Sequence, residues 1–425
     1  MRKHTYVSAE RFIISREFFG LKLGLRNISE FLQSIGAPQT AYRTIHVAGT
    51  NGKGSTAAML AAILQAQGYK TGLFTSPHLV SLRERISVNG RKISKRSVVS
   101  FIDANRPELA RRKLSFFELL AAMAFDHFRR ARVDVAVIET GLGGRLDATN
   151  VLRPELTLTT EISRDHMEIL GRSLIKIARE KAGIIKPAIP HLVGLLPEEA
   201  EEVIRHTCYE KQAPFFRLSA RDMRLYPEEM KFDFRYNGAR WAGVRTSLKG
   251  IHQMRNAALA LKASAILAKN GLPLTRRAQR EGLARTDWPG RFQIISGRRR
   301  PTVILDVAHN ESGVRSFVET FTALYPGRQA EVISGFVKRK EHQKMFDALS
   351  TIARRYALVP LKTRRSTDVD ELIRTIRWRG REFHKFGSLR SAYSKLMKSA
   401  DPDDIIIVIG SHYLVGEFID KIGLK

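Results

Sequence analysis

The stretch from Ile45 to Leu60 constrains the fold of this chain more than any other part of the sequence. A short apolar run leads into seven glycine-rich and polar residues, and an alanine-rich segment continues to Gln67, just before Gly68. This order is typical of a strand, a glycine loop and a helix N-terminus. Glycines let the backbone bend around a phosphate, and the free N–H groups at the helix start point at it.

The glycine loop predicts a site for a nucleoside triphosphate. Its residues are Gly49, Thr50, Asn51, Gly52, Lys53, Gly54 and Ser55. Lys53 adds a mobile positive charge, which distinguishes the loop from a purely structural glycine turn. The usual phosphate-binding loop has Ser or Thr directly after the lysine, whereas here Gly54 stands between Lys53 and Ser55.

Length and composition predict a globular protein of two domains. The chain has 425 residues, of which 43% are hydrophobic, and this exceeds the size of one ordinary core. Cys208 is the single cysteine, which excludes an internal disulfide and any site built from several thiolates. No run approaches the 18 or so apolar residues of a membrane span. We expect a cytoplasmic protein without a membrane partner, and a monomer, because no long apolar stripe indicates an obligate interface.

The chain carries a net charge of +30, from 72 Lys and Arg residues against 42 Asp and Glu residues. Such an excess can indicate a nucleic-acid partner. However, the small basic clusters, for example 298–300 and 338–340, lack the interleaved aromatic residues of a single-strand binding face. We therefore interpret the charge as a solvated basic surface that attracts anionic substrates, and keep a nucleic-acid-binding ATPase as the lesser hypothesis.

Three predicted strands end at residues that could bind a metal ion. Ser76 follows the strand 70–74, Glu139 ends the strand 134–139, and His166 follows the β-prone run 156–162. The carboxyl ends of parallel strands meet at one edge of a doubly wound sheet, where ligands gather. Mg²⁺ prefers a few such protein ligands together with water and phosphate oxygens. The sequence therefore predicts a magnesium site beside the triphosphate.

The remaining sequence predicts a peripheral hairpin, then a second and smaller α/β domain. The hairpin runs over 231–248 and turns at Asn237-Gly238. Strands and helices alternate again after residue 301, beginning with the strand 302–307 and including a helix over 342–353. The basic segment 297–301 is the best linker candidate, so we predict an ATP-binding domain over 1–296 and a C-terminal domain over 297–425. Residues that follow the first strand of the second domain would face the glycine loop across a cleft.

Eight motifs in the same order resemble the folylpolyglutamate synthase/dihydrofolate synthase branch of the Mur ligase superfamily, over nearly the whole chain. They are 49–55, 75–79, Glu139 with 141–150, 165–166, 180–183, 250–253, 289–291 with 306–310, and 410–417. Gly54, unusual for a general phosphate-binding loop, is what the folate branch has at this position. The resemblance implies a central P-loop domain with a mostly parallel sheet and a smaller Rossmann-like C-terminal domain.

The resemblance implies ATP-dependent amide formation between a pteroate or folate carboxylate and the amine of L-glutamate, through an acyl phosphate. It implies two Mg²⁺ sites, K⁺ as a further candidate, and a carbamate on Lys181, which periodicity alone would place on a solvated helix face. Lys53, Lys181 and His166 are the catalytic candidates. ATP would contact 49–55 with Asn256, Arg291, Asp306 and His309, and metal would contact Ser76, Glu139, His166 and Lys181, with Ser55 as the alternative hydroxyl. Pteroate would contact Ser115, Phe116, Phe117, Glu118, Leu146, Asp147 and Ala148.

Two questions stay open at the level of the sequence. Phe116 and Phe117 have two interpretations, packing in the core and stacking on a pterin ring. A bifunctional enzyme and a single-activity enzyme would use the same cleft, so the motifs do not separate them. The sequence also departs from the family pattern at Glu161, at Glu311 and at 338–340. These departures bear on substrate preference and glutamate placement, because none removes a phosphate or metal ligand.

Overall fold

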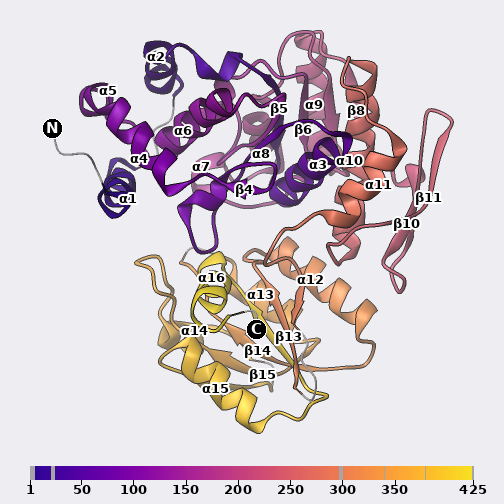
Figure 1. The fold of residues 1–425 in the computed structure, drawn as a ribbon. Coiled ribbons are helices and arrows are strands. Elements are labelled where there is room, and N and C mark those ends of the chain that lie inside the picture. Colours follow the sequence, from indigo (N-terminus) through magenta and orange to yellow (C-terminus); the bar gives the residue numbers. More distant parts are fainter. Residues whose placement is uncertain (1–4, 21–23, 296–299, 339, 379, 424–425) are drawn as a thin grey trace.

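The computed structural model describes residues 5–20, 24–295, 300–338, 340–378 and 380–423. Two lobes follow one another along the chain, each built on its own sheet, and Figure 1 shows the C-terminal lobe below the N-terminal one. The α/β architecture predicted from the alternation of strands and helices is confirmed. The expected linker at 297–301 lies mostly outside the described residues.

The N-terminal lobe contains an eight-stranded sheet in the order β4-β3-β2-β5-β1-β6-β7-β8, in which only β3 and β4 run antiparallel to their neighbours. Its strands are β1 Arg43–Ala48, β2 Thr71–Phe74, β3 Ile86–Val88, β4 Arg91–Lys92, β5 Val135–Glu139, β6 Leu156–Thr159, β7 His191–Val193 and β8 Phe215–Arg217. The central strands β1, β5 and β6 are buried throughout apart from Arg43, as expected for parallel strands covered on both faces.

Helices cover both faces of this sheet and form two large cores, and α7, α8 and α9 form a third, smaller one. One large core contains α3, α10 and α11, and the other large core contains α1, α2, α4 and α6. The helices are α1 Tyr6–Ser15, α2 Arg26–Ser34, α3 Lys53–Gln67, α4 Lys95–Ala104, α5 Arg106–Arg111, α6 Phe116–Ala131, α7 Met167–Leu170, α8 Leu174–Ala182, α9 Glu198–Glu210, α10 Ile251–Lys269 and α11 Arg276–Arg285. The sheet is therefore doubly wound, with β1 and the loop after it at its centre.

The predicted hairpin is present and belongs to a three-stranded antiparallel sheet of β9 Met223–Tyr226, β10 Lys231–Tyr236 and β11 Ala239–Arg245. Asn237 and Gly238 form its turn, both with positive φ, as expected for an Asn-Gly hairpin. Apolar residues of β10 and β11 pack into the core that contains α3 and α10.

The C-terminal lobe has a six-stranded sheet in the order β12-β13-β17-β14-β15-β16. Its strands are β12 Gln293–Ile295, β13 Thr302–Asp306, β14 Ala330–Ser334, β15 Ala353–Leu358, β16 Glu382–Lys385 and β17 Ile405–Ile409, and its helices are α12 Glu311–Leu324, α13 His342–Leu349, α14 Val369–Thr375, α15 Leu389–Ser399 and α16 His412–Lys421. The antiparallel edge strand β12 precedes the predicted linker and pairs with β13. The helix expected over 342–353 ends at Leu349, because Ala353 already pairs with Ala330.

Candidate active site

A cleft of about 580 Å³ lies between the two lobes and is lined by residues of both. Its N-terminal wall contains the glycine loop and the ends of β2, β5 and β6. Its C-terminal wall contains the loop after β13 and the start of α16. The cleft is thus located at the carboxyl edge of the first sheet, where the sequence predicted ligands to gather.

At two positions of the glycine loop, the backbone conformation favours glycine. Gly49 and Gly52 have φ of 148° and 81°, and a Cβ on Gly49 would lie 2.0 Å from the hydroxyl of Thr160. α3 begins at Lys53, whose Nζ donates to the carbonyl of Thr50 at 3.0 Å. The first N–H groups of α3 therefore face the cleft together with a lysine, as anion binding requires.

Packing explains why glycine stands at position 54, and the sequence did not show this. A Cβ at this position would lie 2.9 Å from the indole of Trp288, which is packed against the core containing α3. Ser55, the alternative metal hydroxyl, is buried, and its Oγ accepts a hydrogen bond from Gln253 at 3.2 Å. Gln253 in turn accepts from Asn256 at 3.1 Å, so the start of α10 braces the loop.

Arg291 and Asp306 lie together at the edge of the C-terminal lobe. The carboxylate of Asp306 accepts from the backbone N–H of Phe292 at 2.8 Å and of Ala308 at 2.7 Å. Burial raises the pKa of Asp306, and the neighbouring Arg291 opposes that rise. Asp306 thus holds the loop that carries His309 while remaining part of the cleft wall.

Ser76 and Glu139 are brought together as predicted. The backbone N–H of Ser76 donates to Glu139 Oε2 at 2.9 Å. Burial raises the pKa of Glu139, although the positive charges of Lys53 and Arg291 partly offset it. A buried carboxylate beside the lysine of the glycine loop fits a Mg²⁺ ion that takes its other ligands from phosphates and water.

His166 lines the same cleft, but it does not belong to a preformed group of metal-binding side chains. It has a φ of 49°, and its ring approaches Glu168 at 3.9 Å. In the part of the chain that the structure describes, no group of three His, Cys, Asp or Glu side chains is arranged to hold a metal ion. A magnesium site here therefore needs phosphate oxygens to complete it.

Lys181 is buried, not solvated as its charged helix would indicate. Only 3% of it is exposed, and its Nζ donates to the carbonyl of Gly49 at 2.5 Å. Burial, together with the nearby charge of Lys53, lowers the pKa of Lys181 to about 7. Lys181 therefore lies directly beneath the glycine loop, and the surface interpretation is excluded.

The segments assigned to pteroate line the cleft, but several of their side chains are engaged within the protein. Ser115 and Glu118 cap α6 reciprocally, and the carboxylate of Glu118 also accepts from Asn27. The carboxylate of Asp147 accepts from the backbone N–H groups of Gly141 and Leu142, both at 2.8 Å. These side chains shape the walls of the cleft, and Leu146 and Ala148 contribute to its lining.

Phe116 and Phe117 have the core contacts of one interpretation, and stacking on a pterin ring stays a prediction. Each packs against the core that contains α6 and each also lines the cleft. The guanidinium of Arg85 lies 5.2 Å from the ring centre of Phe116, and Phe117 approaches Gly141 so closely that a Cβ there would be 2.4 Å from its ring. The two rings thus form an aromatic wall that is continuous with the core.

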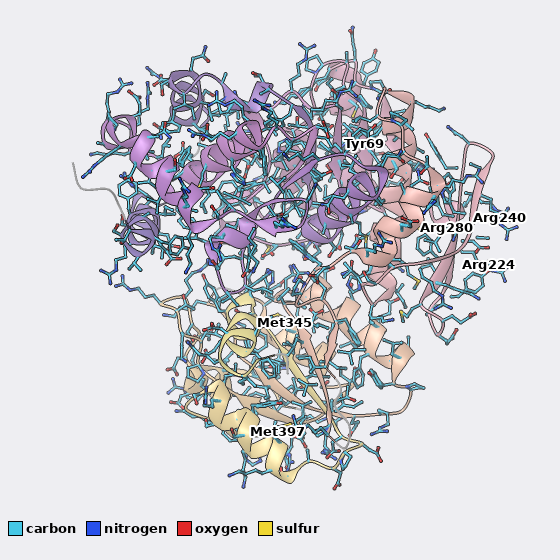
Figure 2. The ribbon with its side chains drawn as sticks, in the orientation of Figure 1. Tyr69, Arg224, Arg240, Arg280, Met345 and Met397 are labelled. Carbon is cyan, nitrogen blue, oxygen red and sulfur yellow. The ribbon has the colours of Figure 1, made fainter. Side chains whose placement is uncertain are left out.

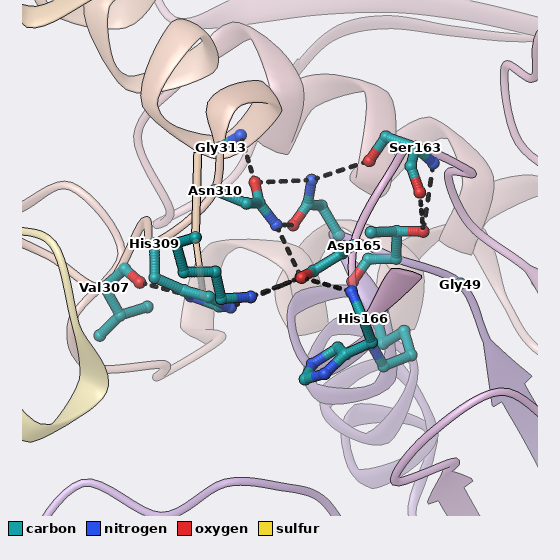
Figure 3. Close-up of polar contacts among 12 residues, drawn as sticks. Gly49, Ser163, Asp165, His166, Val307, His309, Asn310 and Gly313 are labelled. Atoms are coloured by element: carbon teal, nitrogen blue, oxygen red, sulfur yellow. Dashed lines mark hydrogen bonds and ion pairs between the residues drawn. The ribbon is translucent and has the colours of Figure 1, made fainter. Parts of the chain in front are cut away.

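Polar contacts cross the cleft and join the two lobes (Figure 3). Asn310 Nδ2 donates to Asn51 Oδ1 at 3.0 Å and to Asp165 Oδ2 at 3.1 Å. Lys340 forms an ion pair with the same Asp165 carboxylate, and Ser312 Oγ donates to Glu161 Oε1 at 2.7 Å. Two residues at which the sequence departs from the family pattern, Glu161 and Lys340, therefore both take part in the contact between the lobes.

The structure adds cleft residues to which the sequence analysis assigns no role. Arg85 is buried and donates to His78 at 2.9 Å, and His412 is half-buried with its ring centre 5.2 Å from that of His309. Nε2 of His412 has no hydrogen-bond partner among the described residues. His412 belongs to the motif 410–417 that supports the family resemblance, but only the packing of α16 against the first lobe brings it to the cleft.

Comparison with known proteins identifies the family. The Mur ligase middle domain matches residues 47–264, and the Mur ligase glutamate ligase domain matches residues 290–412. The dihydrofolate synthase/folylpolyglutamate synthase of Bacillus subtilis is 37% identical over 96% of this chain and 93% of its own. This chain belongs to the folylpolyglutamate synthase/dihydrofolate synthase family of Mur ligases.

Solved structures of this ligase family have the same fold. Mycobacterium tuberculosis folylpolyglutamate synthase complexed with ADP matches with a TM-score of 0.89 at 30% identity, over 99% of this chain and 98% of that one. Escherichia coli FolC in complex with DHPP and ADP matches with a TM-score of 0.87, also at 30% identity, over 97% of both chains. The predicted P-loop domain and Rossmann-like C-terminal domain are thus confirmed. No helix in the described ranges is long and apolar enough to cross a membrane.

Proposed function

We propose that this ligase joins L-glutamate both to dihydropteroate and to tetrahydrofolate or its polyglutamates, with hydrolysis of ATP to ADP and phosphate. The observation that carries the proposal is one cleft at which a phosphate-binding loop, a buried carboxylate and a loop of the second lobe converge. The Bacillus subtilis relative, which bears both activities in its name, supports the bifunctional form.

Different residues of the cleft would have different roles in the reaction. Lys53 and the first N–H groups of α3 would hold the β- and γ-phosphates, with Arg291 adding charge from the second lobe. The substrate carboxylate attacks the γ-phosphorus, ADP leaves, and an acyl phosphate forms. The glutamate amine then attacks the acyl carbon, loses a proton, and phosphate leaves. Holding both substrates in line between the lobes supplies the proximity on which each step depends.

Metal ions and a modified lysine complete the proposal. Ser76, Glu139 and His166 would hold Mg²⁺, which neutralises charge on the transferring phosphoryl group. Lys181, if carbamylated, would be an anion able to help hold a second Mg²⁺, and K⁺ is a further candidate. The low pKa of Lys181 favours this modification, because a neutral amine is the form that reacts with carbon dioxide. We also propose a cytoplasmic monomer of two domains. The division predicted at 297 needs one change, because β12, Gln293–Ile295, pairs with β13 and so belongs to the second domain.

The decisive experiment measures ADP release with glutamate and either dihydropteroate or tetrahydrofolate. Glutamate-dependent turnover with both substrates is expected. Turnover with one alone would establish the single-activity alternative, and turnover with neither would refute the assignment. Lys53→Ala serves as the site control and should lose about 100-fold or more in kcat, because a preorganised charge on the transferring group is removed.

A further inference from the structure

A basic surface lies on the outer face of the small sheet β9–β10–β11, away from the cleft. Phe232 and Phe234 of β10 and Trp241 of β11 point inward, into the core that contains α10. Alternation along the strands sends the residues between them outward. The exposed outward residues are Arg224 of β9, Arg235 of β10, and Arg240 and Arg245 of β11.

The register of this sheet places like charges opposite one another. Arg235 pairs with Arg240 across β10 and β11, and Lys231 pairs with Arg245. Like charges directly opposite in an antiparallel sheet destabilise it. Stability of the fold therefore gives no reason for these basic pairs.

Few carboxylates neutralise the surface. Asp233 pairs with Arg240 at 3.0 Å, and Glu229 pairs with Lys231. Asp233 also stands opposite Arg224 in the register of β9 and β10, although among the described residues no ion pair within 4.0 Å involves Arg224, Arg235 or Arg245. Arg245 donates only to the backbone carbonyl of Glu229.

An aromatic ring and a basic helix extend the same surface. Two cations lie over the ring of Tyr226, the guanidinium of Arg224 at 5.3 Å and Lys231 Nζ at 5.2 Å from the ring centre. Arg280 of α11 donates to the carbonyl of Ala242 at 2.7 Å and so joins the helix to β11. Figure 2 shows Arg224, Arg240 and Arg280 along one edge of the molecule, where β10, β11 and α11 lie in Figure 1.

We propose that the outer face of β9–β10–β11, with the exposed arginines of α11, binds the phosphate backbone of a nucleic acid. Arginines spread over neighbouring strands and a helix can contact successive phosphates. No residue of these four elements lines the ATP cleft, so this binding does not depend on the proposed ligase function. The short basic clusters of the sequence did not show the surface, because it forms only when the three strands pair.

The test compares the full-length chain with two triple variants of equal charge. The surface variant is Arg224→Gln/Arg235→Gln/Arg240→Gln. The matched control is Arg153→Gln/Lys395→Gln/Lys398→Gln, at exposed basic positions outside the surface for which the structure gives no ion pair. Fluorescence anisotropy with labelled single-stranded RNA and with duplex DNA, over a range of salt concentrations, measures binding.

We expect the wild-type chain and the control to bind at least one of the two probes, with affinity that falls steeply as salt rises. The surface variant should bind at least about tenfold more weakly, and its salt slope should be smaller by about 2 with the single strand or about 3 with the duplex, because three phosphate contacts are lost. The relative affinity of the two probes identifies the form of nucleic acid that binds. The ligase turnover and the melting temperature of the surface variant should match those of the wild type. The substitutions lie outside the cleft, and they remove the repulsion between Arg235 and Arg240, which face each other across the sheet.

Three outcomes would overturn the proposal. Wild-type protein that binds neither probe at low salt would refute it directly. Equal weakening in the control would show that the charge of the whole chain, not this surface, attracts the probe. Binding to phosphatidylserine vesicles that the surface variant loses, without nucleic-acid binding, would make the partner a membrane. Loss of ligase turnover alone in any of these proteins would bear on the proposed function and not on this surface.

Discussion

Lys181 shows how far the environment of a single residue can depart from its local sequence. Its helix carries Arg179 and Glu180, a pattern typical of a solvated face, yet its ammonium is buried against the carbonyl of Gly49, 132 positions away. The burial follows from the packing of α8 beneath the glycine loop. A buried lysine without a hydrogen-bonded carboxylate is costly unless its charge is changed or removed.

Replacing Lys181 by alanine should lower kcat about 100-fold or more, because an anionic carbamate at this position would be lost with its metal contact. Short carboxylates such as acetate should restore part of the rate by occupying the space of the carbamate. Lys176→Ala, at an exposed position of the same helix, is the matched control and should turn over normally. Steady-state ADP release measures all three proteins, and unchanged turnover in Lys181→Ala would contradict the proposed role.

At the scale of elements, α3 and α11 pack at close approach through a glycine. A Cβ on Gly282 would lie 2.5 Å from both the Cα and the N of Ile63, which are backbone atoms that cannot move aside. This contact holds α11 against the helix that carries the glycine loop. It also explains why α11 tolerates a glycine in its interior at a cost in helix propensity.

Gly282→Ala should lower the free energy of unfolding by about 2 kcal/mol, although alanine is the better helix former, because overpacking outweighs propensity. Urea denaturation measures the change. Gly387→Ala, where an added Cβ meets nothing within 4 Å, is the control and should be neutral. A Gly282→Ala protein as stable as the wild type would show that the helices can separate without penalty.

β7 carries a buried histidine that makes stability depend on pH. His191 has hydrogen-bond distances of 2.8 Å to Thr157 and 3.2 Å to Thr159. Burial, with a smaller contribution from Lys211, lowers its pKa to about 3, whereas an unfolded histidine titrates near 6.5. Between these values the unfolded chain binds a proton that the folded chain does not, so stability falls as pH falls below 6.5.

His191→Gln should reduce this dependence while keeping a polar partner for the two threonines. Between pH 6.5 and pH 5.0 the wild type should lose about 2 kcal/mol more than the variant, since one protonation equilibrium accounts for about 1.4 kcal/mol per pH unit. Urea titrations of both proteins at the two pH values measure the difference. Identical pH dependence would mean that His191 is protonated in the folded protein.

At the scale of the whole molecule, the two lobes meet closely enough to form one site. Leu79, from the loop after β2, packs with the C-terminal core, and a Cβ on Gly416 of α16 would lie 2.1 Å from its carbonyl oxygen. This contact, together with the polar bonds around Asp165, sets the distance between the glycine loop and the loop after β13. Domain closure of this kind excludes water and aligns the substrates.

Gly416→Ala should move the lobes apart and lower ligase turnover about tenfold while both domains stay folded, because the new methyl group displaces Leu79. Turnover with saturating ATP and the melting curve together measure this. Gly387→Ala serves again as the neutral control. Normal turnover would show that the loop after β2 can adjust, and that closure does not depend on this contact.

The sequence by itself determined the fold class, the glycine loop and the strand ends that carry Ser76 and Glu139. These features follow from local patterns: alternating strand and helix periods, glycines where φ must be positive, and polar residues directly after buried strands. The tertiary structure alone decided that Lys181 is buried, that Asp165 meets Lys340 from 175 positions away, and that arginines of three strands share one face. Such contacts join residues far apart in the chain, and no local pattern specifies them, because they depend on how whole elements pack.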